Sequence, residues 1–346
     1  MGDVNNPLVS IIVRTKDRPE LLKRALQSIA AQDYRPIEVV LVNDGATTFD
    51  PDFFAEKMQD IPLKYLNNDL RGRTAAANLG LKNCGGEFVC FLDDDDIFYS
   101  DHVSTLSCFL KESDYKIAYT ESYFVHSEYD PVNRKIIQTK KYPAQTMDFS
   151  KETLIFYNYI PFMCLMFKRD VLGSVGGFDE EFEMCEDWDL TIRLAEKYPF
   201  YHINKFTSEY NIWSRNTQSI LNDEQLLFFR KKLFAKNINK ITPSILAKFI
   251  FNGYWVNLKY MEDRINCLEN EISKMQKETD GLMEGKERIW EEKQRLWEET
   301  QRLRDEKQKV ENKFSQLENY INTNTIKIPK KMKSVLKSLI RSKGLL

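Results

Sequence analysis

Four consecutive aspartates, Asp93–Asp96, directly follow the apolar segment Glu87–Leu92. Neighbouring carboxylates repel one another, and they cannot be buried without strong compensation. Two interpretations are open: a solvated acidic turn, or a cluster that holds a cation against a second anion. Asp93 and Asp95 stand at positions i and i+2, which face the same way in an extended segment. Such oxygen ligands suit Mg²⁺ or Mn²⁺, with phosphate oxygens completing the coordination shell.

A purely structural role for the acidic run is the alternative. An acidic cap before a helix that begins near Ser100 would need only one aspartate, and four are present. We therefore favour the metal site and leave Asp96 as a candidate cap for the following turn.

A second polar position also ends an apolar run. Asp44 closes the segment Ile37–Asp44 and can accept hydrogen bonds from a base or a ribose. The sequence Asn43-Asp44-Gly45 is equally typical of a turn without a ligand. We favour a functional Asp44, because a second acidic site then follows a predicted strand.

Strand and helix signals alternate through the first third of the chain. Leu8–Val13, Ile37–Asp44 and Glu87–Leu92 are apolar runs typical of buried strands, and residues 18–32 and 73–84 have helical spacing. This alternation predicts an α/β fold with a mostly parallel, Rossmann-like sheet. Ligands of such sheets bind beyond the carboxyl ends of the strands, which is where both acidic sites lie.

The repeat changes to a heptad pattern from Leu258 to Ile321, which predicts a long helical coiled coil. An unbroken rod of this length would measure about 95 Å. Nine d positions are apolar: Met261, Leu268, Met275, Leu282, Ile289, Leu296, Leu303, Val310 and Leu317. Charge pairs such as Arg264–Glu269 and Glu299–Arg304 would attract across a parallel dimer, so we predict a parallel homodimer. A single solvated charged helix is the alternative, and Gly281 and Gly285 weaken the helix.

The last segment, Ile326–Leu346, carries seven basic and no acidic side chains. Its apolar residues follow helical spacing, so it is typical of a basic amphipathic helix on an anionic membrane surface. A protein partner or a frayed terminus is the alternative.

Composition limits the other possibilities. The formal net charge of −2 excludes an overall basic nucleic-acid footprint. Six cysteines without metal-ligand spacing are typical of reduced thiols. We see no signal peptide pattern and no apolar run long enough to span a membrane, which predicts a cytoplasmic protein, with possible peripheral contact at the inner face of the cell membrane.

Three stretches in order give a family resemblance. "VSIIVRTKDRPELLKRALQSIAAQDYRPIEVVLVNDG", "GRTAAANLGLKNCGGEFVCFLDDDDIF" and "VGGFDEEFEMCEDWDLTIRLA" resemble family 2 glycosyltransferases, which have the GT-A fold. The resemblance covers about residues 7–215. It implies an inverting transfer of a sugar from a nucleotide-sugar donor to a hydroxyl of a glycan or lipid-linked acceptor, as in surface polysaccharide assembly.

The resemblance also implies roles for the acidic residues. Asp95 would contact the Mn²⁺ or Mg²⁺ directly, with Asp93 as a second ligand. Asp93 and Asp94 would contact the ribose or reach the metal through water. Asp187 would be the general base, and Glu186 would orient or replace it. A helix N-terminus that merely favours acidic residues is the alternative for this pair.

The remaining implied contacts are to the donor nucleotide. Thr15 and Lys16 would lie where the family wraps the base, although Lys16 replaces an aromatic residue often found there. Asp44 would contact the nucleoside. Arg73 would lie near the nucleotide, with Arg71 as a competing candidate.

The expected organisation is a GT-A domain over residues 1–220, a helical extension over 221–256, a coiled coil over 257–322 and a basic tail over 323–346. Two other functions stay open. A metal-dependent nucleotidyltransferase would favour a Gly-rich loop after the first strand, and "VRTKDRPE" has no glycine. A non-catalytic nucleotide-binding scaffold would make the rod itself the function.

Overall fold

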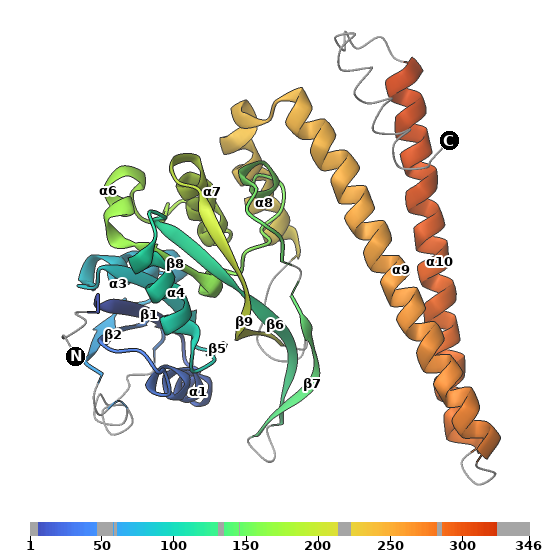
Figure 1. Cartoon of the computed structure of the whole chain (residues 1–346), viewed down its shortest axis with the longest axis horizontal. Helices are drawn as coiled ribbons and strands as arrows, with labels where there is room; N and C mark the ends of the chain where they lie inside the picture. Colours follow the sequence, from blue (N-terminus) through green and yellow to red (C-terminus); the bar gives the residue numbers. More distant parts are fainter. Residues whose placement is uncertain are drawn as a thin grey trace. The chain divides into compact units, whose positions relative to one another are not determined.

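The computed structural model describes residues 6–46, 58, 61–130, 135–144, 146–213, 223–281 and 286–323. The chain divides into two compact units, Met1–Ile238 and Asn239–Leu346, which are considered separately (Figure 1).

A nine-stranded sheet forms the centre of the first unit, with the order β3-β2-β1-β4-β8-β6-β9-β5 and with β7 paired to β6. The strands β3, β2, β1 and β4 are parallel, as are β6 and β9, and the other pairs are antiparallel. The strands are β1 (Val9–Thr15), β2 (Ile37–Asn43), β3 (Leu63–Asn67), β4 (Phe88–Asp93), β5 (Ile97–Phe98), β6 (Ile117–Asp130), β7 (Lys135–Pro143), β8 (Leu165–Lys168) and β9 (Phe200–Trp213). The predicted α/β fold is confirmed, and the sheet is mixed.

Helices cover both faces of the sheet. α1 (Pro19–Ala30) and α4 (His102–Glu112) pack on one face, and α3 (Arg73–Asn83) and α7 (Glu186–Lys197) pack on the other. Alternate residues of one strand enter the two layers, as Ile11 and Ile12 do in β1. Burial on both faces explains why these strands are continuous apolar runs in the sequence.

The other helices of the unit are α5 (Lys151–Leu154), α6 (Leu172–Val175), α8 (Asp223–Asn237) and the 3₁₀ turns Phe162–Cys164 and Arg169–Val171. A third 3₁₀ turn, Ile238–Lys240, begins at the last residue of the unit. α8 packs its buried Leu233 against Phe182 and Trp188, so the first compact unit continues through this helix.

The helix α3 approaches β1 closely through Gly80. A Cβ atom at Gly80 would collide with Cγ2 of the buried Ile12, whereas one at Gly173 would meet nothing within 4 Å. Gly80 and Gly173 both lie inside helices, so replacing either by alanine should raise the helix propensity by a similar amount. We expect Gly80→Ala to lower the free energy of unfolding by about 1–3 kcal/mol. The control Gly173→Ala should be neutral or stabilising in the same urea titration, and equal effects of the two would contradict the close packing.

The second unit contains α9 (Pro243–Gly281) and α10 (Lys286–Thr323). The described residues do not show the predicted unbroken rod, because α9 and α10 lie side by side. The two helices pack against each other through Ile265 and Leu268 of α9 and Leu296 and Leu303 of α10.

Ion pairs link the two helices, which run in opposite directions in Figure 1. Arg264 lies 3.1 Å from Glu299, and Glu269 pairs with Arg304. Glu262 lies 3.7 Å from Lys307. The charged residues that were expected to pair between two parallel chains thus pair within one chain. These heptad positions flank the apolar contact between the helices both in a parallel dimer and in a helix pair of one chain.

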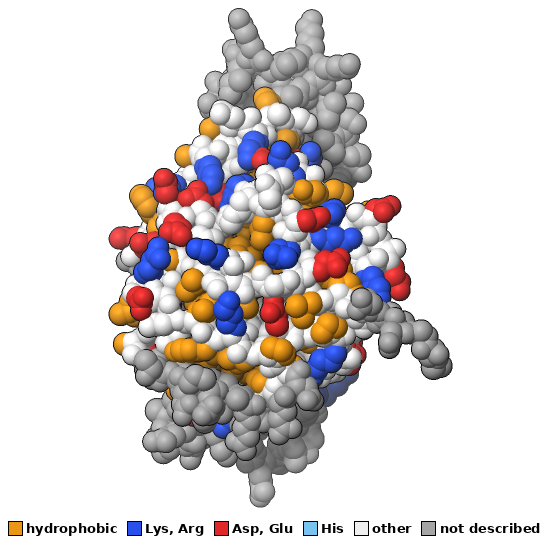
Figure 2. Space-filling view, turned by 90° about the vertical axis from the view of Figure 1, so that its left-hand side faces the viewer, with side chains coloured by type: hydrophobic (Ala, Val, Ile, Leu, Met, Phe, Trp, Pro, Cys, Tyr) orange, Lys and Arg blue, Asp and Glu red, His pale blue; other side chains and the backbone are white. Residues whose placement is uncertain are grey.

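None of the helices in the described part of the chain combines the length and the apolar content that a membrane crossing requires. The predicted basic tail lies outside the described residues. On the face drawn in Figure 2, acidic and basic side chains of the described residues are interspersed.

Candidate active site

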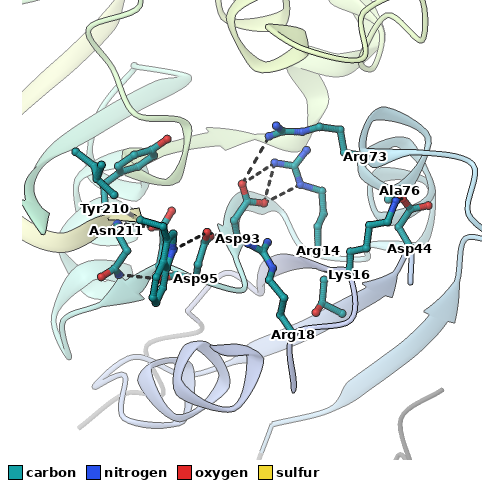
Figure 3. A pocket seen from close by; sticks show the side chains of 14 residues that line it. Arg14, Lys16, Arg18, Asp44, Arg73, Ala76, Asp93, Asp95, Tyr210 and Asn211 are labelled. Carbon is teal, nitrogen blue, oxygen red and sulfur yellow. Dashed lines mark hydrogen bonds and ion pairs between the residues drawn. The ribbon is translucent and has the colours of Figure 1, made fainter. Parts of the chain in front are cut away.

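A cavity of about 640 Å³ lies at the carboxyl ends of β1 and β4 (Figure 3). Its walls are formed by Arg14, Thr15, Lys16, Arg18, Asp44, Arg73, Ala76, Asp93, Asp95, Asp96, Tyr210, Asn211, Ile212 and Trp213. The parallel register of β1 with β2 and β4 brings Thr15, Asp44 and Asp93 to one edge of the sheet.

Three aspartates of the acidic run line the cavity, whereas Asp94 is buried in the protein interior. The side chains of Asp93 and Asp95 line the cavity and are 33% and 18% exposed. Asp94 is fully buried, where Oδ2 accepts hydrogen bonds from Thr15 Oγ1 at 2.7 Å and Arg18 Nε at 3.1 Å. Asp96 is 5% exposed and accepts a hydrogen bond from the Asn211 backbone N–H at 2.8 Å. Asp94 is therefore placed to hold the loop and not to contact a ribose, unlike the role that the resemblance implies.

The four carboxyl groups have different pKa values. Burial raises the pKa of Asp94 to about 7, although Arg18 partly offsets this effect. Burial and the charge of Asp95 raise the pKa of Asp96 well above its usual value. Burial also favours the neutral form of Asp93, but Arg14, Arg73 and Arg18 outweigh it and hold the pKa of Asp93 below its usual value. The run therefore does not carry four full charges at neutral pH.

Arg14 joins the acidic run to the acidic pair of α7. Its guanidinium donates to both oxygens of Asp93, at 2.8 and 2.9 Å, and to Glu186 Oε1 at 2.9 Å. Arg73 approaches the same Glu186 oxygen at 2.8 Å and Asp93 at 3.9 Å. Glu186 is fully buried, and its Oε2 has no hydrogen-bond partner among the described residues.

Removal of Arg14 should destabilise the fold strongly. Arg14 is 8% exposed, and its loss leaves buried carboxylates without their main counter-charge. We expect Arg14→Ala to lower the free energy of unfolding by about 3–5 kcal/mol. The control is Arg71→Ala, whose side chain is 67% exposed and should change that energy by less than about 0.5 kcal/mol. Urea titration of both variants tests the difference, and a stable Arg14→Ala variant would contradict the proposed charge balance.

Asp44 is buried at the opposite side of the cavity from the acidic run (Figure 3). Its Oδ1 accepts hydrogen bonds from Asn68 Nδ2 at 2.6 Å and from the Gly72 backbone N–H at 2.9 Å. Its Oδ2 lies 3.7 Å from the Lys16 ammonium, which is 60% exposed. The carboxylate is thus fixed on one side and faces Lys16 on the other.

The two arginine candidates are separated by the structure. Arg73 lines the cavity, whereas Arg71 is exposed, lies 4.0 Å from Glu180 and does not line it. Arg73 is therefore the better placed of the two to contact a nucleotide.

Asp187 lies beside the cavity without lining it. It occupies the first turn of α7 and is half-buried. Burial and the charge of Glu186 raise its pKa to about 6, and Arg73 and Arg14 partly oppose them. Its charge also acts on the Tyr210 hydroxyl in the cavity wall. A carboxyl group with this pKa accepts protons near neutral pH, as a general base must.

The donor set suits a divalent ion that shares its coordination with a substrate. Asp93 and Asp95 offer hard carboxylate oxygens in the cavity, which suit Mg²⁺ or Mn²⁺. Among the described residues, no three His, Cys, Asp or Glu side chains come together as a metal site. The residues therefore fit an ion that takes its other ligands from phosphate and water, and do not fit one held by protein alone.

Several residues of the cavity were not predicted from the sequence. Arg14 and Arg18 flank the predicted Thr15 and Lys16, and three basic residues at alternate positions after a strand are a signal that could have identified them. Trp213 donates a hydrogen bond to Asp95 Oδ2 at 3.2 Å, and Tyr210 also lines the wall. No sequence signal links these two residues to the acidic run, since about 115 positions separate them.

Comparisons with known proteins find similarities that begin within the first unit. Residues 10–175 match the family described as Glycosyl transferase family 2. The chain is 28% identical over 197 residues to the uncharacterized glycosyltransferase YwdF of Bacillus subtilis, which is 55% of this chain and 69% of that protein. It is 26% identical over 208 residues to the Escherichia coli glycosyl transferase WcaA, whose name refers to colanic acid biosynthesis; this covers 56% and 68% of the two chains.

Two solved structures are similar in fold. TarS of S. aureus, residues 1–349 in complex with UDP-GlcNAc, superposes with a TM-score of 0.52 at 20% identity, covering 76% of this chain and 80% of that one. The mannosyltransferase PcManGT of Pyrobaculum calidifontis, in complex with GDP-Man and Mn2+, gives 0.51 at 20% identity, covering 70% and 67%. The likeness supports the GT-A-like fold. The family match covers β2, β4 and nearly all of β1, whereas β9, which supplies Tyr210 and Trp213 to the cavity wall, lies outside it. Residues 10–175 of this chain are therefore similar to the family described as Glycosyl transferase family 2.

Proposed function

We propose that the chain is an inverting glycosyltransferase that moves a sugar from a nucleotide-sugar donor to an acceptor hydroxyl. The observation that carries the proposal is the cavity at the strand ends, where Asp93 and Asp95 face the basic residues Arg14, Arg18 and Arg73. A nucleoside diphosphate needs such a combination of cations and metal-binding carboxylates.

The charge balance of the cavity explains how the diphosphate would be accommodated. Its walls contain four basic residues, Arg14, Lys16, Arg18 and Arg73, and four aspartates. Without a ligand, the arginines pair with the aspartates. A divalent ion held by Asp93 and Asp95 would take up part of the negative charge that the arginines balance, so that Arg14, Arg18 and Arg73 could donate to phosphate oxygens. Bound Mn²⁺ or Mg²⁺ supplies positive charge to the diphosphate as it leaves.

The transfer step would use Asp187 as the base. The acceptor oxygen forms a bond to the anomeric carbon while the bond from that carbon to the diphosphate breaks. The hydroxyl proton passes to the Asp187 carboxylate, and a single displacement inverts the anomeric carbon. Glu186 is the positioning residue, because it anchors Arg14 and Arg73 beside the diphosphate.

The nucleoside would lie between Thr15, Lys16 and Asp44. Asp44 is buried and held by Asn68, so its position needs little reordering when a ligand binds. The complexes of TarS with UDP-GlcNAc and of PcManGT with GDP-Man and Mn2+ support a nucleotide-sugar donor and a metal.

Calorimetry with a panel of nucleotide sugars, with and without Mn²⁺, tests the proposal. We expect one donor to bind more tightly with Mn²⁺ and to be hydrolysed slowly without an acceptor. Failure to bind any donor would instead favour the nucleotide-binding scaffold or a wholly structural role. Release of pyrophosphate from a nucleoside triphosphate would favour a nucleotidyltransferase.

The cellular role is a separate part of the proposal. A function in polysaccharide or glycan assembly is supported by the similarity to WcaA. The predicted contact of residues 323–346 with the inner face of the membrane stays a prediction, and deletion of these residues should then move the protein to the soluble fraction. The parallel homodimer also stays a prediction, and it would require α9 and α10 to separate. Molar mass measured by light scattering distinguishes one chain from two.

A further inference from the structure

Three aromatic residues form a row across the strands that extend from the cavity. Phe124 of β6 is paired in register with Tyr210 of β9 and with Tyr142 of β7. The ring centroids lie 5.6 Å apart for Phe124 and Tyr210, and 5.9 Å apart for Phe124 and Tyr142. Because paired residues of neighbouring strands share a face, the three rings lie on one face of the sheet. We call Tyr210, Phe124 and Tyr142 the aromatic row.

The aromatic row begins in the cavity and leads away from it. Tyr210 lines the cavity and is 41% exposed. In Figure 3 it lies on the other side of Asp93 from Arg14 and Arg73. Figure 1 shows β6 and β7 as a long twisted hairpin with β9 beside β6, so the row continues outward over this hairpin.

Polar groups accompany the outer end of the row. His126 Nε2 lies 3.0 Å from the Tyr142 hydroxyl, and the Lys140 ammonium lies 5.3 Å from the Tyr142 ring centroid. His126 is itself paired in register with Lys140 of β7 and with Ile212 of β9, another cavity residue. This face therefore combines flat apolar rings with hydrogen-bonding groups.

The aromatic row is not needed to hold the hairpin on the sheet. None of its three rings belongs to the buried clusters on either side of the sheet. Other side chains fix β7 to β9, because Lys141 pairs with Glu209 at 2.7 Å and Gln138 also bonds to Glu209. Aromatic rings are usually buried, so a row of partly exposed rings beside a cavity is unusual unless a ligand covers them.

We propose that the aromatic row is the acceptor subsite and binds the pyranose rings of a carbohydrate acceptor next to the transferred sugar. This inference rests on the proposed glycosyltransferase function. The C–H bonds of a pyranose carry partial positive charge and can lie on the negative face of an aromatic ring. The ring hydroxyls meet His126, Tyr142 and Lys140. Binding sites that combine aromatic walls with a few polar groups are typical of small ligands.

Substitutions at Tyr142 and Phe124 separate stacking from general apolar binding. Leucine keeps the apolar character but removes the ring face, so Tyr142→Leu and Phe124→Leu should each weaken oligosaccharide binding about tenfold. Tyr142→Phe keeps the ring and should bind within about twofold of the parent. The control is Tyr201→Leu, which removes a partly exposed ring from the far end of β9 and should not change binding.

The probes are neutral linear oligosaccharides of glucose, N-acetylglucosamine and mannose, titrated into the full chain and followed by NMR saturation transfer. Thermal melting of each variant confirms that it is folded. Leucine variants that bind as the parent does, or a parent chain that binds none of the probes, would overturn the inference.

A separate titration of UDP and GDP with Mn²⁺ distinguishes the two proposals. Oligosaccharide binding without nucleotide binding would overturn the glycosyltransferase function and, with it, the assignment of this surface as an acceptor subsite. Nucleotide binding without any oligosaccharide binding would overturn the acceptor subsite alone.

Discussion

Replacement of Asp187 by asparagine is expected to lower the rate of sugar transfer about 10²–10⁴-fold, because asparagine cannot take the acceptor proton. Donor affinity should change little, since Asp187 does not line the cavity. Transfer with the donor found in the hydrolysis screen measures the first effect, and calorimetry measures the second. The control Glu183→Gln removes an exposed carboxylate from the same segment and should leave both quantities unchanged.

The pH dependence gives an independent readout of the same residue. Asp187 must be ionised to act as a base, and its pKa is about 6. The transfer rate should therefore rise as the pH increases through about 6 and then level off. A profile without this rise would argue against Asp187 as the base.

The contribution of Asp187 to stability should fall as the pH rises, whereas the transfer rate should increase. A carboxyl group whose pKa is raised by folding binds more protons in the folded state between its unfolded value of 3.8 and about 6. The free energy of unfolding contributed by Asp187 therefore falls as the pH rises through this interval. Asp187→Asn should be no less stable than the parent at neutral pH, so that its inactivity cannot be attributed to unfolding.

The second large effect is expected at Asp95. Asp95→Asn should weaken donor binding in the presence of Mn²⁺ about 10²–10³-fold. The reason is that a bound divalent ion stabilises the negative charge of the phosphates by several kcal/mol. Without Mn²⁺ the parent and the variant should bind the donor equally weakly. The comparison requires calorimetry with and without the metal.

Asp101→Asn is a suitable control for this prediction. Asp101 follows the same acidic segment but pairs with Lys205 and does not line the cavity. It should keep the full effect of Mn²⁺. Equal donor binding by the parent and Asp95→Asn in Mn²⁺ would contradict a metal role for Asp95.

Much of the first unit is determined locally by the sequence. The apolar runs at β1, β2 and β4 are buried on both faces of the sheet, so their composition alone predicted interior strands. The turn residues that follow these strands placed Asp44 and Asp93 at one sheet edge, because parallel neighbours end on the same side. The heptad pattern likewise predicted helices with a continuous apolar seam.

The tertiary structure decided the features that depend on distant partners. The alternation of side chains along an extended segment could not show that Asp94 and Asp96 are buried. Their partners, Arg18 and Asn211, come from other elements. The choice between Arg73 and Arg71 depended on which side chain reaches Glu186. The aromatic row depends on the registers of β6 with β7 and of β6 with β9, which align the three rings. The contact of α9 with α10 was also open, because the apolar seam of a heptad repeat can pack against a helix of the same chain or of another chain. Sequence thus determines the local element and its apolar face, whereas pairing over long separations requires the folded chain.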